Sequence, residues 1–382
     1  MGDISALNHS QPHLARLLGY LESDPDNLRL IGDAVSAALD VRQPGVALDL
    51  IRRYEAIAPL TPVMRNFEGL AALHQDRFDA AADIFQGLLS GQTQDPGLRF
   101  NLAWCKSITG DHAGAAGLLD DATVAAIPAA ASLKVQALHR QGDLDEALAE
   151  GTKALEIHPA DTDLLGALSM VAIDLQMPEL AQGWAAKAQD TSDGLSTLGM
   201  LVLQDDRLDE AMGYFDRGLA ARADSPRNWL GKGLVLMARG DAAGATECID
   251  RSAELFGRHL GTWIASGWAH FAAGDRTRAR GIFEHALALD DTFAESHGAL
   301  AVLDVLDGDI DGARRRTDTA LRLDRRCFSG ALAKVLLLEH DGDMQAAQRV
   351  RDIALNTPVG ESGRTIAQAV IALAPRQGGR QF

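Results

Sequence analysis

The chain has 382 residues, of which 47% are hydrophobic, and its formal net charge is −17 because 53 Asp and Glu outnumber 36 Lys and Arg. A surface this acidic repels phosphate backbones and anionic headgroups, so we expect neither nucleic acid nor an anionic membrane surface as a partner. Val, Ile and Thr are much scarcer than Ala, Leu and Gly, which favours helices over strands.

The three cysteines, Cys105, Cys248 and Cys327, are far apart and form no CxxC pair. They are expected to be unpaired thiols in a reducing compartment. The first twenty residues lack a basic n-region with a long apolar core, and no run of about eighteen apolar residues could span a bilayer. These features predict a cytoplasmic protein without an integral membrane segment.

The first predicted element is a helix in "PHLARLLGYLE", residues 12–22, and a repeated pattern follows from residue 28. Six Gly-Asp pairs recur along this pattern, and each of their glycines is followed five residues later by alanine. The six glycines are Gly110, Gly142, Gly240, Gly274, Gly308 and Gly342. The alanine column extends from Ala47 to Ala347 with spacings of 34, 34, 32, 34, 30, 34, 34, 34 and 34. This regularity indicates ten tandem units.

Two further columns keep the same register. Small residues recur seven positions before the turn, as at Gly69, Gly199, Gly233 and Gly267, and large apolar residues recur four positions after the alanine, as at Phe85, Phe215, Ile249 and Phe283. Small residues at matched places let two helices approach closely, with the large side chain filling the gap. Glycine accepts the left-handed backbone that ends a helix, and the following aspartate can cap the next one. Each unit therefore predicts a helix, a Gly-Asp turn and a second helix.

At these positions the units resemble tetratricopeptide repeats. The best matches are "NWLGKGLVLMARGDAAGATECI" from Asn228 and "TWIASGWAHFAAGDRTRARGIFEHAL" from Thr262. The resemblance extends over about residues 28–360. It implies an all-α fold, a right-handed superhelical solenoid of antiparallel helix pairs.

The irregular units suggest how the array is divided. In "RQPG" and "QMPE", Pro44 and Pro178 are expected to replace the turn glycine, and the 30-residue spacing before Ala211 has lost about one helical turn. We therefore predict a kink near residues 188–194. The expected parts are an N-terminal capping helix in 1–27, units one to five in 28–190, units six to ten in 191–360, and a C-terminal capping helix and tail in 361–382.

The sequence contains no Walker A loop, HExxH or GxSxG motif, and the Gly-x-Gly at Gly231 lies inside a predicted helix. Glu295 and His297 are two residues apart, which places them on different helix faces, so a capping or packing role is favoured over a metal site. Acidic and basic residues alternate in "DRTRARGIFEH" and in "DIDGARRRTDTALRLDRR", which ends in the basic "RLDRR". These charges are interpreted as a solvated face, with a clamp for an acidic segment as the alternative. We expect no enzyme activity, no cofactor and no metal.

The resemblance implies that the first helices line a concave face that binds peptides or protein segments. One row on these helices is mostly apolar, and a second row follows three residues later. From the two rows the candidate partner-binding residues are Asn101, Trp104, Met170, Met200, Leu234, Met237, Trp268 and Phe271. Trp263 occupies the column of Trp229 and is expected to be core. The alternative is that neighbouring units or the terminal helices cover these rows.

The predicted function is a non-enzymatic scaffold that binds an apolar or amphipathic segment of a protein or peptide partner, because such rows suit an apolar helix laid in a groove. The alternatives are a regulator or chaperone that sequesters a peptide, and an accessory subunit of an envelope or secretion assembly. Neither the identity of the partner nor the oligomeric state follows from the sequence.

Overall fold

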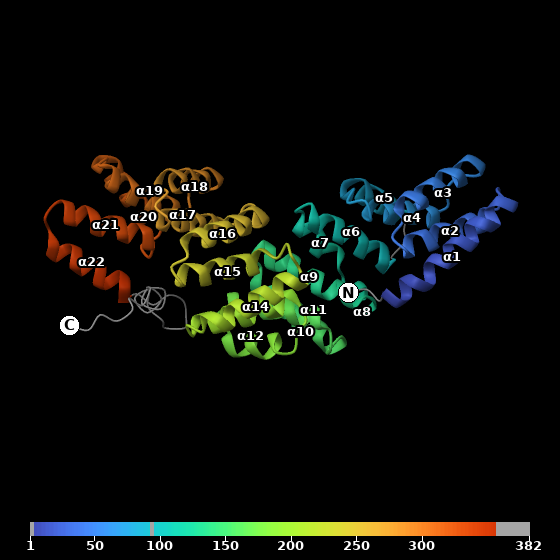
Figure 1. Cartoon of the computed structure of the whole chain (residues 1–382), viewed down its shortest axis with the longest axis horizontal. Coiled ribbons are helices and arrows are strands. Elements are labelled where there is room, and N and C mark those ends of the chain that lie inside the picture. The colour runs from blue at the N-terminus through green and yellow to red at the C-terminus, as the bar shows by residue number, and fades with distance from the viewer. Residues whose placement is uncertain (1–3, 92–94, 357–382) are drawn as a thin grey trace. The chain divides into compact units, whose positions relative to one another are not determined.

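The computed structural model describes residues 4–91 and 95–356, and these residues form 22 α-helices without a strand. Consecutive helices run as antiparallel pairs in chain order (Figure 1). The chain divides into two compact bodies, an N-terminal body that ends at Leu168 and a C-terminal body that begins at Ser169. The all-α array of helix pairs predicted from the repeat is therefore confirmed.

The N-terminal body begins with α1 (Ile4–Ser23). Three pairs follow: α2 (Leu28–Asp40) with α3 (Pro44–Ile57), α4 (Pro62–Leu73) with α5 (Phe78–Ser90), and α6 (Pro96–Ile108) with α7 (His112–Leu118). After the short helix α8 (Asp121–Ala126), α9 (Pro128–Gln141) pairs with α10 (Leu144–Ile157). The next helix, α11 (Thr162–Asp174), contains the boundary between the two bodies.

The C-terminal body continues with α12 (Pro178–Ala185). Its pairs are α13 (Ser192–Gln204) with α14 (Leu208–Ala221), α15 (Pro226–Ala238) with α16 (Ala242–Phe256), α17 (Leu260–Ala272) with α18 (Arg276–Leu289), α19 (Ala294–Asp307) with α20 (Ile310–Leu323), and α21 (Phe328–His340) with α22 (Met344–Asn356). We call α11, which precedes α12 in the fifth unit, and the first member of each pair the first helices, namely α2, α4, α6, α9, α11, α13, α15, α17, α19 and α21.

The Gly-Asp turns have the predicted geometry. All six turn glycines have φ between 80° and 90°, the left-handed region that glycine enters without a steric cost. Five of the six following aspartates accept a hydrogen bond from a backbone N–H three residues on, as Asp309 does from Gly312 at 2.9 Å. The exception is Asp143, whose side chain makes no cap bond. The glycine therefore ends the first helix and the aspartate starts the second.

The expectation that proline replaces the turn glycine is wrong. Four units without the glycine still place a left-handed residue in the same column, at Arg42, Asp76, Gln176 and Asp206, with φ of 55° to 60°. Pro44 and Pro178 instead begin α3 and α12, where the missing N–H removes no helical hydrogen bond. Ending the first helix requires this backbone conformation whichever residue occupies the position.

The small and large columns pack against each other within one unit. An added Cβ at Gly69, Gly199, Gly233 or Gly267 would lie closer than 3.0 Å to the side chain sixteen residues later, which is Phe85, Phe215, Ile249 or Phe283. The three phenylalanines are completely buried and Ile249 is 1% exposed. The glycine removes the side chain that would otherwise hold the two helices apart. This pairing explains why the two columns keep a common register.

One column closes the loop before three of the first helices, α15, α17 and α19. In three successive units a ring N–H donates to the backbone carbonyl six residues earlier, and the bonds run from Trp229 Nε1 to Ala223 O (2.9 Å), from Trp263 Nε1 to Gly257 O (2.6 Å) and from His297 Nε2 to Asp291 O (2.8 Å). Trp263 also meets the His285 ring edge-on, with centroids 4.6 Å apart. It faces the paired helix as predicted, but it is half-buried because its ring closes a surface loop.

The two short spacings have local causes. In the 32-residue unit the second helix breaks into α7 and α8, and Asp120 caps α8 by accepting from Thr123 N at 2.9 Å. In the 30-residue unit α12 has only eight residues. The compact bodies divide inside α11, and the boundary drawn from the sequence at residue 190 stays a prediction, as does the kink near residues 188–194.

The two ends of the array differ in how much is described. Leu14, Leu17 and Leu21 of α1 are buried in one cluster with Ile31 and Val35 of α2. The predicted C-terminal capping helix and tail, residues 361–382, lie outside the described residues.

Candidate partner-binding face of the first helices

All eight predicted contact residues lie on first helices. Asn101 and Trp104 belong to α6 of the N-terminal body, whereas Met170, Met200, Leu234, Met237, Trp268 and Phe271 lie on α11, α13, α15 and α17 in the C-terminal body. Trp104 is 44% exposed and the other seven are half-buried. Their role in binding a partner stays a prediction, but each of them keeps part of its surface in contact with solvent.

The exposure changes sharply from one residue to the next. Ala103 and Cys105, the neighbours of Trp104 in the chain, are completely buried. Trp104 instead stays exposed, and its ring lies 6.3 Å from the ring of Phe100. Since a helix turns by about 100° per residue, one face of α6 packs into the core while the next presents an aromatic pair to solvent.

The predicted row is covered at one place, the helix α19. Val302, which follows Trp268 by 34 residues and so belongs to the same row, is only 2% exposed. The equivalent residues on α15, α17 and α21, which are Leu234, Trp268 and Leu336, are half-buried. The cause is Gly298, where an added Cβ would lie closer than 3.0 Å to the backbone of Gly330 on α21. The close approach of α19 and α21 covers Val302, so this residue cannot contact a partner.

Trp268 forms the wall of an apolar hollow of about 410 Å³ in the C-terminal body. The Trp268 ring packs edge-to-face against Phe271 and Phe283, with ring centroids 5.5 and 5.3 Å apart. These contacts fix the orientation of the indole ring. The hollow is lined from three first helices and the loops before them by Gly261, Ile264, Trp268, Phe293, Glu295, Phe328, Ser329 and Leu332. We call it the Trp268 hollow.

The one carboxylate at the Trp268 hollow is already engaged. Glu295 accepts hydrogen bonds from the backbone N–H groups of Phe328 (2.7 Å) and Ser329 (3.1 Å), which fixes the start of α21. Cys327 Sγ caps the same helix end by accepting from Gly330 N at 3.2 Å. Burial raises the pKa of the Cys327 thiol to about 12, and the nearby charge of Glu295 acts in the same direction. The thiol is therefore protonated and unreactive at neutral pH.

Sequence reasoning missed four apolar residues of this hollow, Ile264, Phe293, Phe328 and Leu332. A signal was present, because Ile264 and Leu332 are separated by 68 residues, twice the 34-residue repeat, and so share a column. The glycine at position 298 of that column hides the pattern. Phe293 and Phe328 lie just before or at the start of their helices, where a face cannot be assigned by periodicity.

Beside Trp268, the side chains of Asp250, Ser266 and His270 form a hydrogen-bonded cluster that joins two helices. Asp250 of α16 accepts hydrogen bonds from Ser266 Oγ and from His270 Nε2, the latter at 2.9 Å. Ser266 and His270 therefore both donate to the Asp250 carboxylate. They are not hydrogen-bonded to each other, so they do not form a nucleophile–base pair. The acid joins α16 to α17 along the side of the unit.

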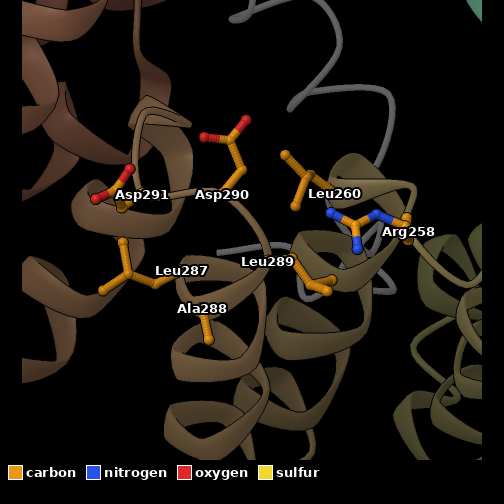
Figure 2. Close-up of a pocket in the computed structure, with 7 residues that line it drawn as sticks. All are labelled: Arg258, Leu260, Leu287, Ala288, Leu289, Asp290 and Asp291. Carbon is orange, nitrogen blue, oxygen red and sulfur yellow. The ribbon is translucent and has the colours of Figure 1, made fainter.

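A second hollow of about 660 Å³ opens beside the loop that leads into α17 (Figure 2). Arg258 and Leu260 line one side, and the end of α18, from Leu287 to Asp291, lines the other. Hydrogen bonds from Thr292 hold the pKa of Asp290 below its usual range, and the charge of Arg258 adds to this effect. The lining thus combines leucine side chains with charged groups of both signs.

Two of the arginines that we expected on a solvated face are half-buried and bind a buried carboxylate of the C-terminal body. Asp304, 5% exposed, accepts from Arg280 Nη1 at 2.9 Å and from Arg316 Nε at 3.0 Å. A buried carboxylate requires such partners because an unpaired charge there is costly. Arg322, Arg325 and Arg326 are exposed, as the sequence analysis favoured.

The described part of the chain contains neither a candidate metal cluster nor a candidate membrane-spanning helix. No group of three or more His, Cys, Asp or Glu side chains there could hold a metal ion. Among the same residues no helix combines the length and the apolarity needed to cross a bilayer.

The geometry defines a class, the helical repeat proteins, because helix pairs of about 34 residues repeat the same turn, cap and packing contact. Residues 33–98 and 109–162 match the model of the tetratricopeptide repeat family. The chain therefore contains tetratricopeptide repeats. No curated protein matches it.

Two solved structures with TM-scores above 0.5 share the fold, and a third is similar over part of this chain. A human IFIT1 dimer with PPP-AAAA is 12% identical, with a TM-score of 0.51 and coverage of 93% of this chain and 95% of that chain. A monomeric mutant of IFIT1 with Gppp-AAAA is also 12% identical, with a TM-score of 0.54 over 92% of this chain and 95% of that one. A tetratricopeptide repeat protein from Parabacteroides merdae is 19% identical, with a TM-score of 0.40, and covers 64% of this chain and 98% of that chain.

Proposed function

We propose that the protein is a non-enzymatic scaffold that binds an apolar or amphipathic segment of another protein on the first helices of its C-terminal body. The observation that carries this proposal is the Trp268 hollow, an apolar depression of about 410 Å³ whose only carboxylate already caps α21. A hollow with so little free polarity suits a large apolar side chain and offers a charged one no partner.

The row of half-buried apolar residues extends the same chemistry along the face. Met200, Leu234, Met237 and Phe271 lie on α13, α15 and α17, and each retains exposed surface. Helix-in-groove recognition uses apolar anchors spaced by three or four residues, and methionines adapt to partners of different shape. Tetratricopeptide repeats generally mediate protein binding, and three buried cysteines without a disulfide support a reducing compartment such as the cytoplasm.

The test is selection of peptides from a random display library on the immobilised full chain, followed by anisotropy titration of the selected peptides. We expect sequences with large apolar residues at helical spacing. Leu332→Lys, which places an ammonium group at the wall of the Trp268 hollow, should weaken binding by at least about tenfold, because an apolar anchor would leave that charge unpaired.

Leu323→Lys serves as the matched control. Leu323 is an exposed leucine at the end of α20, and it does not line the hollow, so its replacement should leave the affinity unchanged. Circular dichroism melts establish that both variants are folded. Equal binding of the wild type and a folded Leu332→Lys variant would contradict the proposed site.

A further inference from the structure

A separate hollow of about 300 Å³ lies in the N-terminal body, between α8, α9 and α10. Val124, Ala131, Val135 and Ala154 line its interior, and each is less than 9% exposed. The valine and alanine side chains make the interior of the hollow mostly hydrocarbon. Its volume is at the lower end of the range for small-molecule pockets, which begins at about 300 Å³.

The hollow exists because the second helix of this unit is broken. The other second helices of the N-terminal body run without interruption for 13 or 14 residues, but here α7 ends at Leu118 and α8 begins at Asp121. Asp120 caps α8 through Thr123 N and Thr123 Oγ1, at 2.9 and 2.7 Å. The carbonyl of Val124 is bound by His158 Nε2 at 2.8 Å, which ties α8 to the end of α10. The position of α8 is therefore specified by polar contacts on both sides.

Two ion pairs line this hollow, and α10 supplies the cation of one pair and the anion of the other. Lys153 Nζ donates to Asp121 Oδ1 at 2.7 Å and joins α10 to α8, and Lys134 Nζ donates to Glu150 Oε2 and joins α9 to α10. The hydrogen bond to Asp121 raises the pKa of Lys153, and the charge of Glu150 raises it further. The charge of Lys134 in turn reaches Asp121, whose pKa is lowered chiefly by Lys153. The four groups thus form one network of alternating charge.

We propose that this hollow binds a free α-amino acid with an aliphatic or aromatic side chain. The apolar interior would hold the side chain, the ligand carboxylate would accept hydrogen bonds from Lys153 and Lys134, and the ligand ammonium would donate to Glu150 and Asp121. A lysine ammonium has three donors and a carboxylate has about four lone-pair sites, so these contacts can form while the existing ion pairs persist.

The charge network also argues against simpler ligands. A plain anion would bring a negative charge next to Asp121 and Glu150, and a plain cation would do the same to the two lysines. A zwitterion adds one charge of each sign and leaves neither set of protein groups facing a like charge. The 300 Å³ interior limits the ligand to one small apolar body.

The experiment is calorimetric titration of the full chain with L-leucine and L-phenylalanine, compared with three analogues. N-acetyl-L-leucine lacks the ammonium, L-leucinamide lacks the carboxylate, and glycine lacks the apolar body. We expect one saturable site for at least one of the two amino acids and at least about tenfold weaker binding of all three analogues, since each loses one of the three contacts.

Three variants locate the site. Lys153→Met removes one cation, Glu150→Gln removes one anion, and Ala125→Phe fills the hollow from an exposed position on α8. Each should weaken binding by at least about tenfold. The matched control is Lys232→Met, because Lys232 also donates to a carboxylate, Asp216 at 2.7 Å, but lies in the C-terminal body away from this hollow.

The proposal is overturned if neither amino acid gives a saturable signal up to its solubility, or if N-acetyl-L-leucine and L-leucinamide bind as tightly as L-leucine. Binding that survives in folded Lys153→Met and Ala125→Phe would overturn it as well. None of these residues lies on the face tested with Leu332→Lys, so the two proposals stand or fall separately.

Discussion

At the scale of single residues, one backbone position in each turn decides how a first helix ends. Six units hold glycine there, while Arg42, Asp76, Gln176 and Asp206 adopt the same left-handed conformation with side chains attached. For an L-residue this conformation costs roughly 1–2 kcal/mol, because Cβ crowds the following carbonyl oxygen. The repeat tolerates this cost, since packing of the two helices supplies far more free energy than one turn loses.

Arg42→Gly is therefore expected to raise the free energy of unfolding by about 0.5–1 kcal/mol, because relief of the left-handed strain exceeds the extra entropy that glycine loses on folding. The reverse change, Gly240→Ala at the same column, should lower it by about 1–2 kcal/mol. Urea denaturation followed by circular dichroism measures both. A lower unfolding free energy for Arg42→Gly would refute the strain argument.

At the scale of elements, the distance between the two helices of a unit is set by a glycine and a phenylalanine sixteen residues apart. Gly267 faces the completely buried Phe283, and an added Cβ would lie closer than 3.0 Å to the ring. The pair appears in the sequence because both positions belong to a single unit. Because the core is closely packed, the Phe283 ring has no space to move away from an added side chain at position 267. A larger residue there should therefore lower the free energy of unfolding.

Gly267→Ala is predicted to destabilise the protein by about 1–3 kcal/mol through overpacking. Gly281→Ala is the matched control, because Gly281 lies within α18 and an added Cβ there has no neighbour within 4 Å. That change should stabilise by up to about 1 kcal/mol, since alanine is the better helix former. Thermal denaturation of both variants is the measurement, and a similar effect at the two sites would contradict the packing argument.

At the scale of the whole molecule, the formal net charge of −17 predicts weak binding to polyanions. The IFIT1 structures share the helical arrangement and contain PPP-AAAA or Gppp-AAAA, so the fold by itself carries no argument against nucleic acid. We expect the net charge to disfavour nucleic acid, because binding to phosphates requires a basic surface that releases counterions.

The full chain is accordingly expected not to bind a 5′-triphosphorylated oligoadenylate at physiological salt, at about 0.15 M, in a fluorescence anisotropy titration. Human IFIT1 titrated with the same oligonucleotide provides the positive control. Saturable binding that weakens steeply as salt is added would show that a local basic site overcomes the overall charge, and the prediction would be wrong.

What the sequence determined by itself lies within single repeats. The helix pairs, the six turn glycines, the aspartate caps and the Gly267–Phe283 type of contact all join residues of one 34-residue unit, so their periodicity is visible in one chain. The same reasoning placed Trp104 and Trp268 on first helices. It erred on Pro44 and Pro178, because left-handed backbone at a non-glycine residue leaves no trace in composition.

What only the tertiary structure decided depends on contacts between units. Gly298 lets α19 approach α21 and so covers Val302, while Ile264 and Leu332 meet Trp268 around one hollow. Arg280 and Arg316 converge on Asp304 from residues 24 and 12 positions away. The packing of three or more helices sets the distances between side chains of different units. A repeat pattern shows only what the units have in common. The hollows form where neighbouring units differ, so the pattern does not predict them.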